Sequence, residues 1–219
     1  MKLDLHLHSN ISSDAITRPE TILKVAAKKG ITVAITDHNS TSAWHIFEKL
    51  SKEMNQPVIM GEEIRCVVKG QTVGEIVGLF MKEQVKPGSP EFVLEKLHKQ
   101  NALAMAVHPF DSFRNPFLNI ENYINKIDLI EVFNARTYLD EHNKKAKELA
   151  EKNRLPMIAN SDAHTPDEIG TSYTEVNAET LEEARRQLIQ GNGVLHEVKS
   201  PVTVHLTTPL AKFGLIKDR

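Results

Sequence analysis

The sequence has a single cysteine, and it lacks both a long apolar run and a strong net charge. Cys66 alone excludes an intramolecular disulfide framework and a thiolate zinc site, so any metal must bind nitrogen and oxygen ligands. No stretch of about eighteen apolar residues and no apolar signal core occurs, so we expect a cytoplasmic, soluble protein without membrane association. A net charge of -2 gives no general attraction for a nucleic-acid backbone, so no long duplex is expected as a partner.

Motifs of two common enzyme classes are also missing from the chain. The sequence has no glycine-rich phosphate loop, which a nucleoside-triphosphate enzyme would need, and no Ser or Cys nucleophile elbow. The sequence therefore supports neither a nucleoside-triphosphate enzyme nor a hydrolase that forms a covalent intermediate on serine.

Strand and helix patterns alternate along the chain, which is typical of parallel strands joined by crossover helices. With 219 residues and 40% hydrophobic content, the chain is long enough for one α/β domain with a substantial core. We expect that domain over residues 1–199 and a C-terminal appendage over residues 200–219. Strands are expected at residues 2–5, 31–36, 57–64, 72–80, 102–107, 128–133, 155–160 and 172–176, and helices at about 17–29, 41–54, 89–100, 140–153 and 179–190.

Half of the ten histidines lie near carboxylates at the ends of apolar runs. Side chains two apart on a strand point to the same face, so His6 and His8 can bind one ion, and Asp162 and His164 repeat the spacing. One such pair is common by chance, but four segments at strand ends favour a multinuclear metal site. Imidazole and carboxylate ligands suit zinc, manganese or iron. The other two segments carry His38 and His108.

The ordered segments HLHSNISSDA, TDHN, GEE, VHP and SDAH resemble those of the PHP family, named for polymerases and histidinol phosphatases. The resemblance covers roughly residues 1–176. It implies a distorted (β/α)7 barrel, similar to a TIM barrel, with up to three metal ions at the C-terminal strand ends. It also implies hydrolysis of phosphoesters.

The resemblance divides the candidate ligands into three groups. The first ion would be held by His6, His8, Glu62 and Asp162. Glu62 would bridge to a second ion that also binds His108. The third ion would be held by Asp14, His38 and His164.

The residues themselves leave parts of this assignment open. Asp14 is equally well placed as a turn residue. Glu62 and Glu63 are adjacent on a strand and point to opposite faces, so only one enters the barrel mouth, and the family pattern selects Glu62. Asp37 is expected to orient His38 by accepting a hydrogen bond from its ring, rather than to bind metal directly.

The segment Glu75-Ile76-Val77-Gly78 departs from the family pattern, which places a histidine where this chain has Glu75. A carboxylate also binds hard or borderline cations, so we expect Glu75 to be a ligand of the second ion, although an exposed strand glutamate is the simpler alternative. As a ligand it would make the site richer in oxygen and favour manganese, iron or magnesium over zinc.

These observations predict a metal-dependent phosphoesterase acting on a small phosphomonoester or a short nucleotide. Two or three divalent ions (Zn, Mn or Fe, with Mg also possible) would lower the pKa of bound water from about 15.7 towards about 7 and so provide a hydroxide nucleophile. Glu62 and Asp162 are the expected catalytic carboxylates. The cations expected to bind phosphate are Arg136, Arg114 and Arg65, because arginine can grip phosphate with two hydrogen bonds.

Two other hypotheses remain open. A nonphosphate hydrolase would use the same activated water to cleave an amide or a carboxylic ester. A noncatalytic, metal-stabilised regulatory module would keep the metals without the reaction. Retention of nearly the whole ligand set argues against this last hypothesis.

Overall fold

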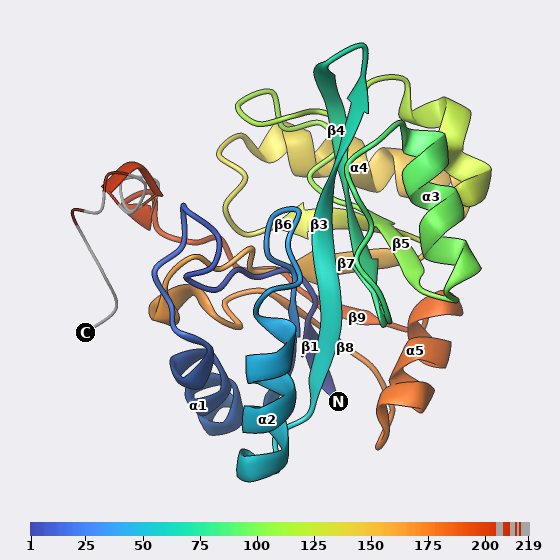
Figure 1. Ribbon diagram of the computed structural model, residues 1–219. Coiled ribbons are helices and arrows are strands. Elements are labelled where there is room, and N and C mark those ends of the chain that lie inside the picture. The colour runs from blue at the N-terminus through green and yellow to red at the C-terminus, as the bar shows by residue number, and fades with distance from the viewer. Residues whose placement is uncertain (205–207, 211–212, 214, 216–219) are drawn as a thin grey trace.

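A nine-stranded sheet curls into a nearly closed barrel in the computed structural model, which describes residues 1–204, 208–210, 213 and 215 (Figure 1). The strands β1 to β7 lie side by side in chain order, and the antiparallel pair β8 and β9 continues the sheet beyond β1. The α/β barrel expected from the sequence is confirmed. The strands are β1 (Lys2–Asp4), β2 (Ile31–Ile35), β3 (Val58–Val68), β4 (Gln71–Leu79), β5 (Leu103–Ala106), β6 (Leu129–Asn134), β7 (Met157–Asn160), β8 (Tyr173–Glu175) and β9 (Val194–His196).

Helices pack on the outside of this sheet. In Figure 1, α1 and α2 lie together on one side of the barrel and α3 and α4 on another. The helices are α1 (Pro19–Lys29), α2 (Trp44–Met54), α3 (Pro90–Lys99), α4 (Asp140–Asn153) and α5 (Leu181–Ile189), with 3-10 turns at Ile120–Lys126 and Pro166–Glu168. Among the described residues, none of these helices has the length and apolarity needed to cross a bilayer.

Local sequence signals set several of these boundaries. Helix α1 starts with Pro19, whose fixed φ suits the first turn, and ends at Gly30, which adopts a φ of 62° that costs glycine little. Ser89 caps α3 by accepting a hydrogen bond from the Phe92 amide. The turn Lys69-Gly70 joins β3 to β4 with both residues at positive φ, as a tight two-residue hairpin requires.

From β1 to β7, the β3–β4 hairpin interrupts an otherwise parallel arrangement. The pairs β1–β2, β2–β3, β5–β6 and β6–β7 are parallel, whereas β4 runs antiparallel to both β3 and β5. The hairpin extends well beyond the barrel in Figure 1. Residues in the middle of β3 and β4 therefore lie level with the loops that follow the shorter parallel strands.

Buried side chains form a core inside the barrel and two more under the helices. The interior cluster includes Leu3, Ile59, Val77, Met105 and Ile158. Since side chains alternate along a strand, Ile59 and Val77 define which residues of β3 and β4 face inward. The cluster that contains Ile64, Cys66 and Ile76 packs on the opposite face, against α3 and α4.

The described part of the C-terminal segment lies against the loop that follows β6. The Ser200 amide donates to the Ala135 carbonyl at 2.9 Å, and the Val204 carbonyl accepts from Arg136. The rest of the predicted appendage, residues 205–207, 211–212, 214 and 216–219, lies outside the described residues.

Candidate metal centre

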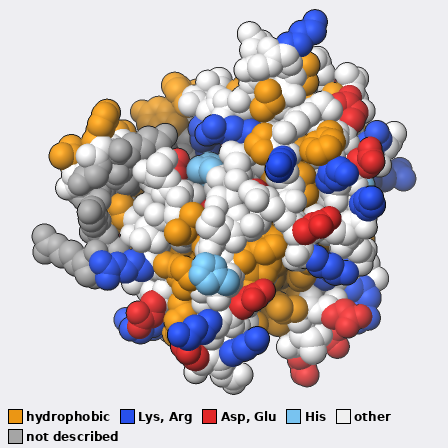
Figure 2. Space-filling view, in the orientation of Figure 1, with side chains coloured by type: hydrophobic (Ala, Val, Ile, Leu, Met, Phe, Trp, Pro, Cys, Tyr) orange, Lys and Arg blue, Asp and Glu red, His pale blue; other side chains and the backbone are white. Residues whose placement is uncertain are grey.

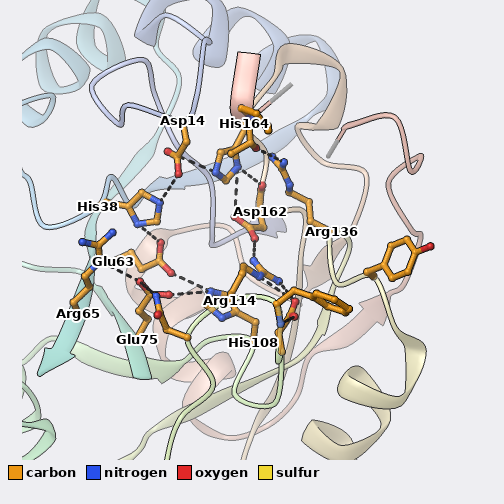
Figure 3. A pocket seen from close by; sticks show the side chains of 16 residues that line it. Asp14, His38, Glu63, Arg65, Glu75, His108, Arg114, Arg136, Asp162 and His164 are labelled. Atoms are coloured by element: carbon orange, nitrogen blue, oxygen red, sulfur yellow. Dashed lines mark hydrogen bonds and ion pairs between the residues drawn. The ribbon is translucent and has the colours of Figure 1, made fainter. Parts of the chain in front are cut away.

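Nitrogen and oxygen donors from six parts of the barrel converge on one cavity (Figure 3). The loops after β1, β2, β5 and β7 contribute histidines and aspartates, and β3 and β4 contribute one glutamate each. His108 and Asp162 adopt positive φ values of 31° and 53°. Such strained positions are uncommon for residues other than glycine and often occur at functional sites.

Glu63 lies at the centre of the cluster. Its Oε2 is 3.5 Å from His6 Nε2, 3.4 Å from His8 Nε2 and 2.8 Å from His38 Nδ1. Its Oε1 is 3.1 Å from His108 Nε2. Burial alone would raise the pKa of Glu63, but His38 and His6 outweigh it and hold the pKa well below its usual range. The side chain is therefore a carboxylate within reach of four imidazoles.

Asp162 faces the same histidines from the end of β7. Its Oδ1 is 3.6 Å from His6 Nε2 and 3.4 Å from His8 Nε2. Its Oδ2 accepts hydrogen bonds from Arg114 and, at 3.1 Å, from Asn134. One oxygen thus points to the imidazoles while the other is held in place.

Asp14, His38 and His164 form a second group around His8. Asp14 lies 3.3 Å from His38 Nε2 and 3.8 Å from His164 Nε2. The His8 ring centroid is 4.4 Å from that of His38 and 4.6 Å from that of His164. Asp14, which the sequence left open as a turn residue, is therefore placed beside two candidate ligands.

The expectation that Glu62 faces the site is wrong. The Glu62 carboxylate accepts hydrogen bonds from the Val85 amide at 3.0 Å and from Gln84 Nε2 at 3.3 Å, on the other face of β3. Glu63 shares the inward face with Ile59, because residues four apart on a strand lie on one side. The register of β3 therefore brings Glu63, and not Glu62, to the position between the histidines.

Glu75 lies at the edge of the cluster, where the sequence placed it. Its Oε2 is 3.8 Å from His108 Nε2, and its Oε1 accepts a hydrogen bond from Asn115 at 3.2 Å. The Arg65 guanidinium lies 3.6 Å from the same carboxylate. Burial, and then the negative charge of Glu63, raises the pKa of Glu75. A cation between these two carboxylates would relieve that repulsion.

Glu131 is a site residue that the sequence analysis missed. This buried carboxylate of β6 is 2.9 Å from His6 Nδ1 and accepts the His108 backbone amide at 2.8 Å. Asn134 and Asn160 hold its two oxygens at 3.0 and 2.9 Å. The available signal was a charged residue inside the apolar run Leu129-Ile130-Glu131-Val132-Phe133, since such a residue is buried only when it has partners.

Asp37 supports the site differently from the prediction. It accepts hydrogen bonds from the Ser9 amide at 2.8 Å, from Ser9 Oγ at 2.7 Å and from Ser12 Oγ at 2.9 Å, instead of one from the His38 ring. Ser12 Oγ in turn accepts the His38 amide at 3.1 Å and lies 3.5 Å from His8 Nδ1. Asp37 therefore fixes the loop that carries Asp14 rather than an imidazole.

The donors fit divalent metal ions. His6 Nε2 and His8 Nε2 are buried and have no hydrogen-bond partner among the described residues, although each faces two carboxylates. Burial, together with the positive charges of His38 and His164, lowers the pKa of His8 to about 4, so its imidazole is neutral and available as a ligand. The sets whose donor atoms all lie within 4.8 Å of one another are His6, His8 and Glu63; His8, His38 and His164; His6, His108 and Asp162; and His38, Glu63 and Glu75.

Three arginines line the cavity, which has a volume of about 670 Å³. Arg114 pairs with Asp111 at 2.9 Å and contacts Asp162, and Arg65 lies beside Glu75. Arg136 is turned to the side of the cavity, where it lies 3.5 Å from Glu168 and donates to Thr208 Oγ1 at 2.7 Å. The structure thus places all three predicted cations at the cavity, with Arg136 the most buried.

The face of the molecule shown in Figure 2 carries charges of both signs. Figure 2 shows Lys and Arg side chains interspersed with Asp and Glu over the visible face, with apolar side chains between them. This mixture agrees with the net charge of -2.

Comparison with known sequences gives one family match and two relatives. The PHP-associated family model matches residues 140–191, which contain α4, Asp162, His164 and α5. An uncharacterised protein of Methanocaldococcus jannaschii is 41% identical over 147 residues, which make up 62% of this chain and 82% of that protein. A second uncharacterised protein of the same organism is 34% identical over 189 residues, or 83% of this chain and 73% of that protein.

Solved structures share the fold at lower identity. A two-domain protein from Bacteroides vulgatus, which contains a predicted PHP-like metal-dependent phosphoesterase, matches with a TM-score of 0.74 and 20% identity over 90% of this chain. The match covers 65% of that protein, so this chain spans less than two thirds of it. A lesion-specific endonuclease from Pyrococcus furiosus matches with a TM-score of 0.58 and 19% identity over 89% of this chain and 57% of its own. The chain belongs to the same family as the two archaeal proteins, and its segment 140–191 and its fold are similar to those of PHP-like proteins.

Proposed function

We propose that the protein is a metal-dependent phosphoesterase that hydrolyses a small phosphomonoester or a short nucleotide. The observation that carries the proposal is the position of Glu63, whose carboxylate lies 2.8 to 3.5 Å from donor nitrogens of four histidines. Carboxylates and neutral imidazoles arranged in this way favour two or three divalent ions held close together. The PHP-like phosphoesterase and the endonuclease among the fold neighbours support the same class of reaction.

The proposed ligands are residues that line the cavity, together with the buried His6 and His8. Glu63, which lies within reach of His6, His8 and His108, would contribute to holding both of the first two ions, and Glu75 would join His108 in holding the second. Zinc, manganese and iron suit this mixed set, and the second carboxylate at His108 admits magnesium. The proposed ligands are His6, His8, Asp14, His38, Glu63, Glu75, His108, Asp162 and His164.

Bound divalent ions would acidify a water molecule and neutralise charge on the phosphate oxygens. The chain itself contributes positioning. Glu131 orients His6, the fixed backbone of Asp162 aims one oxygen at the imidazoles, and Arg114 is close enough to Asp162 to contact a phosphate held beside it. Arg65 and Arg136 are the further proposed phosphate ligands, and residues 1–199 are proposed as the catalytic barrel.

The test is hydrolysis of a generic aryl phosphate by the purified chain of 219 residues. We expect activity after loading with Mn, Fe or Zn, loss with a chelator, and recovery when the metal is returned. Hydrolysis of amides or carboxylic esters but of no phosphoester would replace the proposal with a nonphosphate hydrolase. Stoichiometric metal binding without any hydrolysis would favour a regulatory module.

A further inference from the structure

Two aromatic side chains are exposed at the rim of the metal cavity. Phe113 is 68% and Tyr138 is 55% exposed, yet both line the same cavity as the candidate ligands. Their ring centroids are 6.0 Å apart with an interplanar angle of 83°. A single exposed apolar residue on a protein surface is common and needs no explanation. Phe113 and Tyr138, however, come from separate loops and meet at a polar cavity, and neither ring packs in the core.

The segments that carry both rings are fixed by hydrogen bonds. The Phe113 amide donates to Asp111 Oδ1 at 3.0 Å, and its ring lies 6.2 Å from that of His142. The carbonyl of Tyr138 accepts a hydrogen bond from Lys199 Nζ at 3.2 Å. A preorganised aromatic pair loses little conformational entropy when a ligand binds it.

Arg114 connects the two rings to the metal cluster. Its guanidinium donates to Asp111 Oδ2 at 2.9 and 3.0 Å, and Asp111 also binds the amide of Phe113. The Arg114 guanidinium also donates to Asp162 and, at 3.1 Å, to Thr137 Oγ1. Thr137 directly precedes Tyr138 in the chain. A phosphate held at the cluster next to Arg114 would therefore leave the remainder of the ester near both rings.

We propose that Phe113 and Tyr138 form a binding subsite for an aromatic ring carried by the substrate, either a nucleobase or an aryl group. The inference rests on the proposed function, which places the phosphate at the metal cluster. Aromatic rings prefer edge-to-face and offset stacked contacts, and a perpendicular pair offers both geometries to a third ring. The cavity of about 670 Å³ is within the range that binds ligands larger than phosphate alone.

The experiment compares the metal-loaded wild type with the Phe113→Leu, Tyr138→Leu and double variants. Leucine keeps apolar bulk but removes the ring. The substrates are adenosine 5'-monophosphate, phenyl phosphate and glycerol phosphate. We expect the double variant to lower kcat/KM for the two aromatic esters, relative to glycerol phosphate, by about 10-fold, mainly through KM. A loss confined to the nucleotide would identify a nucleobase, and a loss confined to phenyl phosphate an aryl group.

The matched control is Phe92→Leu, which removes a partly exposed ring on α3 that does not line the cavity. Equal changes for all three esters, or the same change in the control, would overturn the proposal. The proposal would also be overturned if the two rings form a contact between subunits. In that case light scattering would show a lower oligomeric state for the double variant, and its substrate preference would be unchanged.

Calorimetric titration of adenosine 5'-monophosphate and phenyl phosphate into the metal-loaded protein separates this inference from the proposed function. If the wild type hydrolyses no phosphoester, the proposed function fails. The aromatic subsite still stands if the double variant binds either aromatic ester about 10-fold more weakly than the wild type, and it fails if the affinities are equal.

Discussion

The carboxylates of the consecutive residues Glu62 and Glu63 point to opposite faces of β3. Glu63 lies among four imidazoles, and Glu62 accepts the Val85 amide at 3.0 Å on the outer face. Burial raises the pKa of Glu62 to about 7, although the hydrogen bond from the Val85 amide opposes part of this rise. In contrast, His38 and His6 lower the pKa of Glu63 and keep it ionised. Two chemically identical neighbours therefore have different roles, and the difference can be tested directly.

The Glu63→Gln variant should lose bound metal and activity. An amide cannot bridge ions as a carboxylate does, so we expect a drop in kcat/KM and in metal affinity on the order of 100-fold or more, as for the loss of a ligand or its direct support. Elemental analysis and an aryl phosphate assay measure both quantities.

Glu62→Gln is the matched variant on the same strand. Its oxygen can still accept the Val85 amide, so we expect metal content and activity close to those of the wild type. If Glu62→Gln, and not Glu63→Gln, removed the metal, the assignment drawn from the register of β3 would have to be reversed.

The choice between Glu62 and Glu63 shows what the sequence could and could not predict. The structure places His6 beside His8 and Asp162 beside His164, as the i, i+2 spacing predicted. The four residues lie in the loops after β1 and β7, however, and Asp162 has a positive φ, so strand alternation alone does not explain the pairing. The inward face of β3 depends on its pairing with β2 and β4, which no local pattern reveals. Glu131 was missed for the same reason, since its partners come from the loops after β1 and β5 and from β7.

The Glu131→Gln variant should weaken metal binding without removing a ligand. The amide nitrogen of glutamine cannot accept a hydrogen bond, so either His6 Nδ1 or the His108 amide loses its partner. Loss of such support commonly costs about 10- to 100-fold in metal affinity. Competition with a chromogenic chelator measures that affinity.

Glu175→Gln is the control for Glu131→Gln. It removes the charge of a half-exposed glutamate of β8 that is 2.9 Å from His196 of β9 and does not line the cavity, so the cavity is expected to stay unchanged. Equal metal affinities in the wild type and the Glu131→Gln variant would show that Glu131 is only a packing element.

Substitution of Glu75 should change metal preference. Glu75→Ala should lower metal occupancy or activity, whereas Glu75→His should keep a functional site and shift its preference towards zinc, because imidazole suits zinc and carboxylate suits harder ions. Activity titrations with Zn and Mn measure this shift. An anomalous-scattering map of the metal-loaded crystal that shows an ion near His108 and Glu63, with the Glu75 oxygens well beyond about 2.6 Å, would remove Glu75 from the ligand set.

Metal removal should lower thermal stability as well as activity. The cluster brings carboxylates and imidazoles together inside the barrel, and ions that bind only the folded state stabilise it by about 2.7 kcal/mol when present at a hundred times their Kd. We expect the Tm to fall after dialysis against a chelator and to rise again in proportion to the logarithm of the Mn or Zn concentration. A Tm that is the same with and without chelator would mean that the folded protein binds no metal at this site.

Cys66 should make the protein less stable as the pH rises above about 9. Burial, and then the nearby Glu75 and Glu91, raises the pKa of this thiol from 9.0 to about 12. Below 9.0 the thiol is protonated in both states, whereas between these values the unfolded chain releases the proton that the folded chain retains. The free energy of unfolding therefore falls by up to about 1.4 kcal/mol per pH unit in this window.

The Cys66→Ala variant isolates this contribution, because the other groups that titrate at high pH are common to both proteins. We expect the wild type to lose stability relative to the variant between pH 9 and 10.5 in urea unfolding, and parallel pH profiles would contradict the raised pKa. The same burial predicts that a thiol reagent at pH 8 modifies the folded protein no faster than the protein unfolds, since only about 1 in 10,000 thiols is ionised when the pKa is about 12.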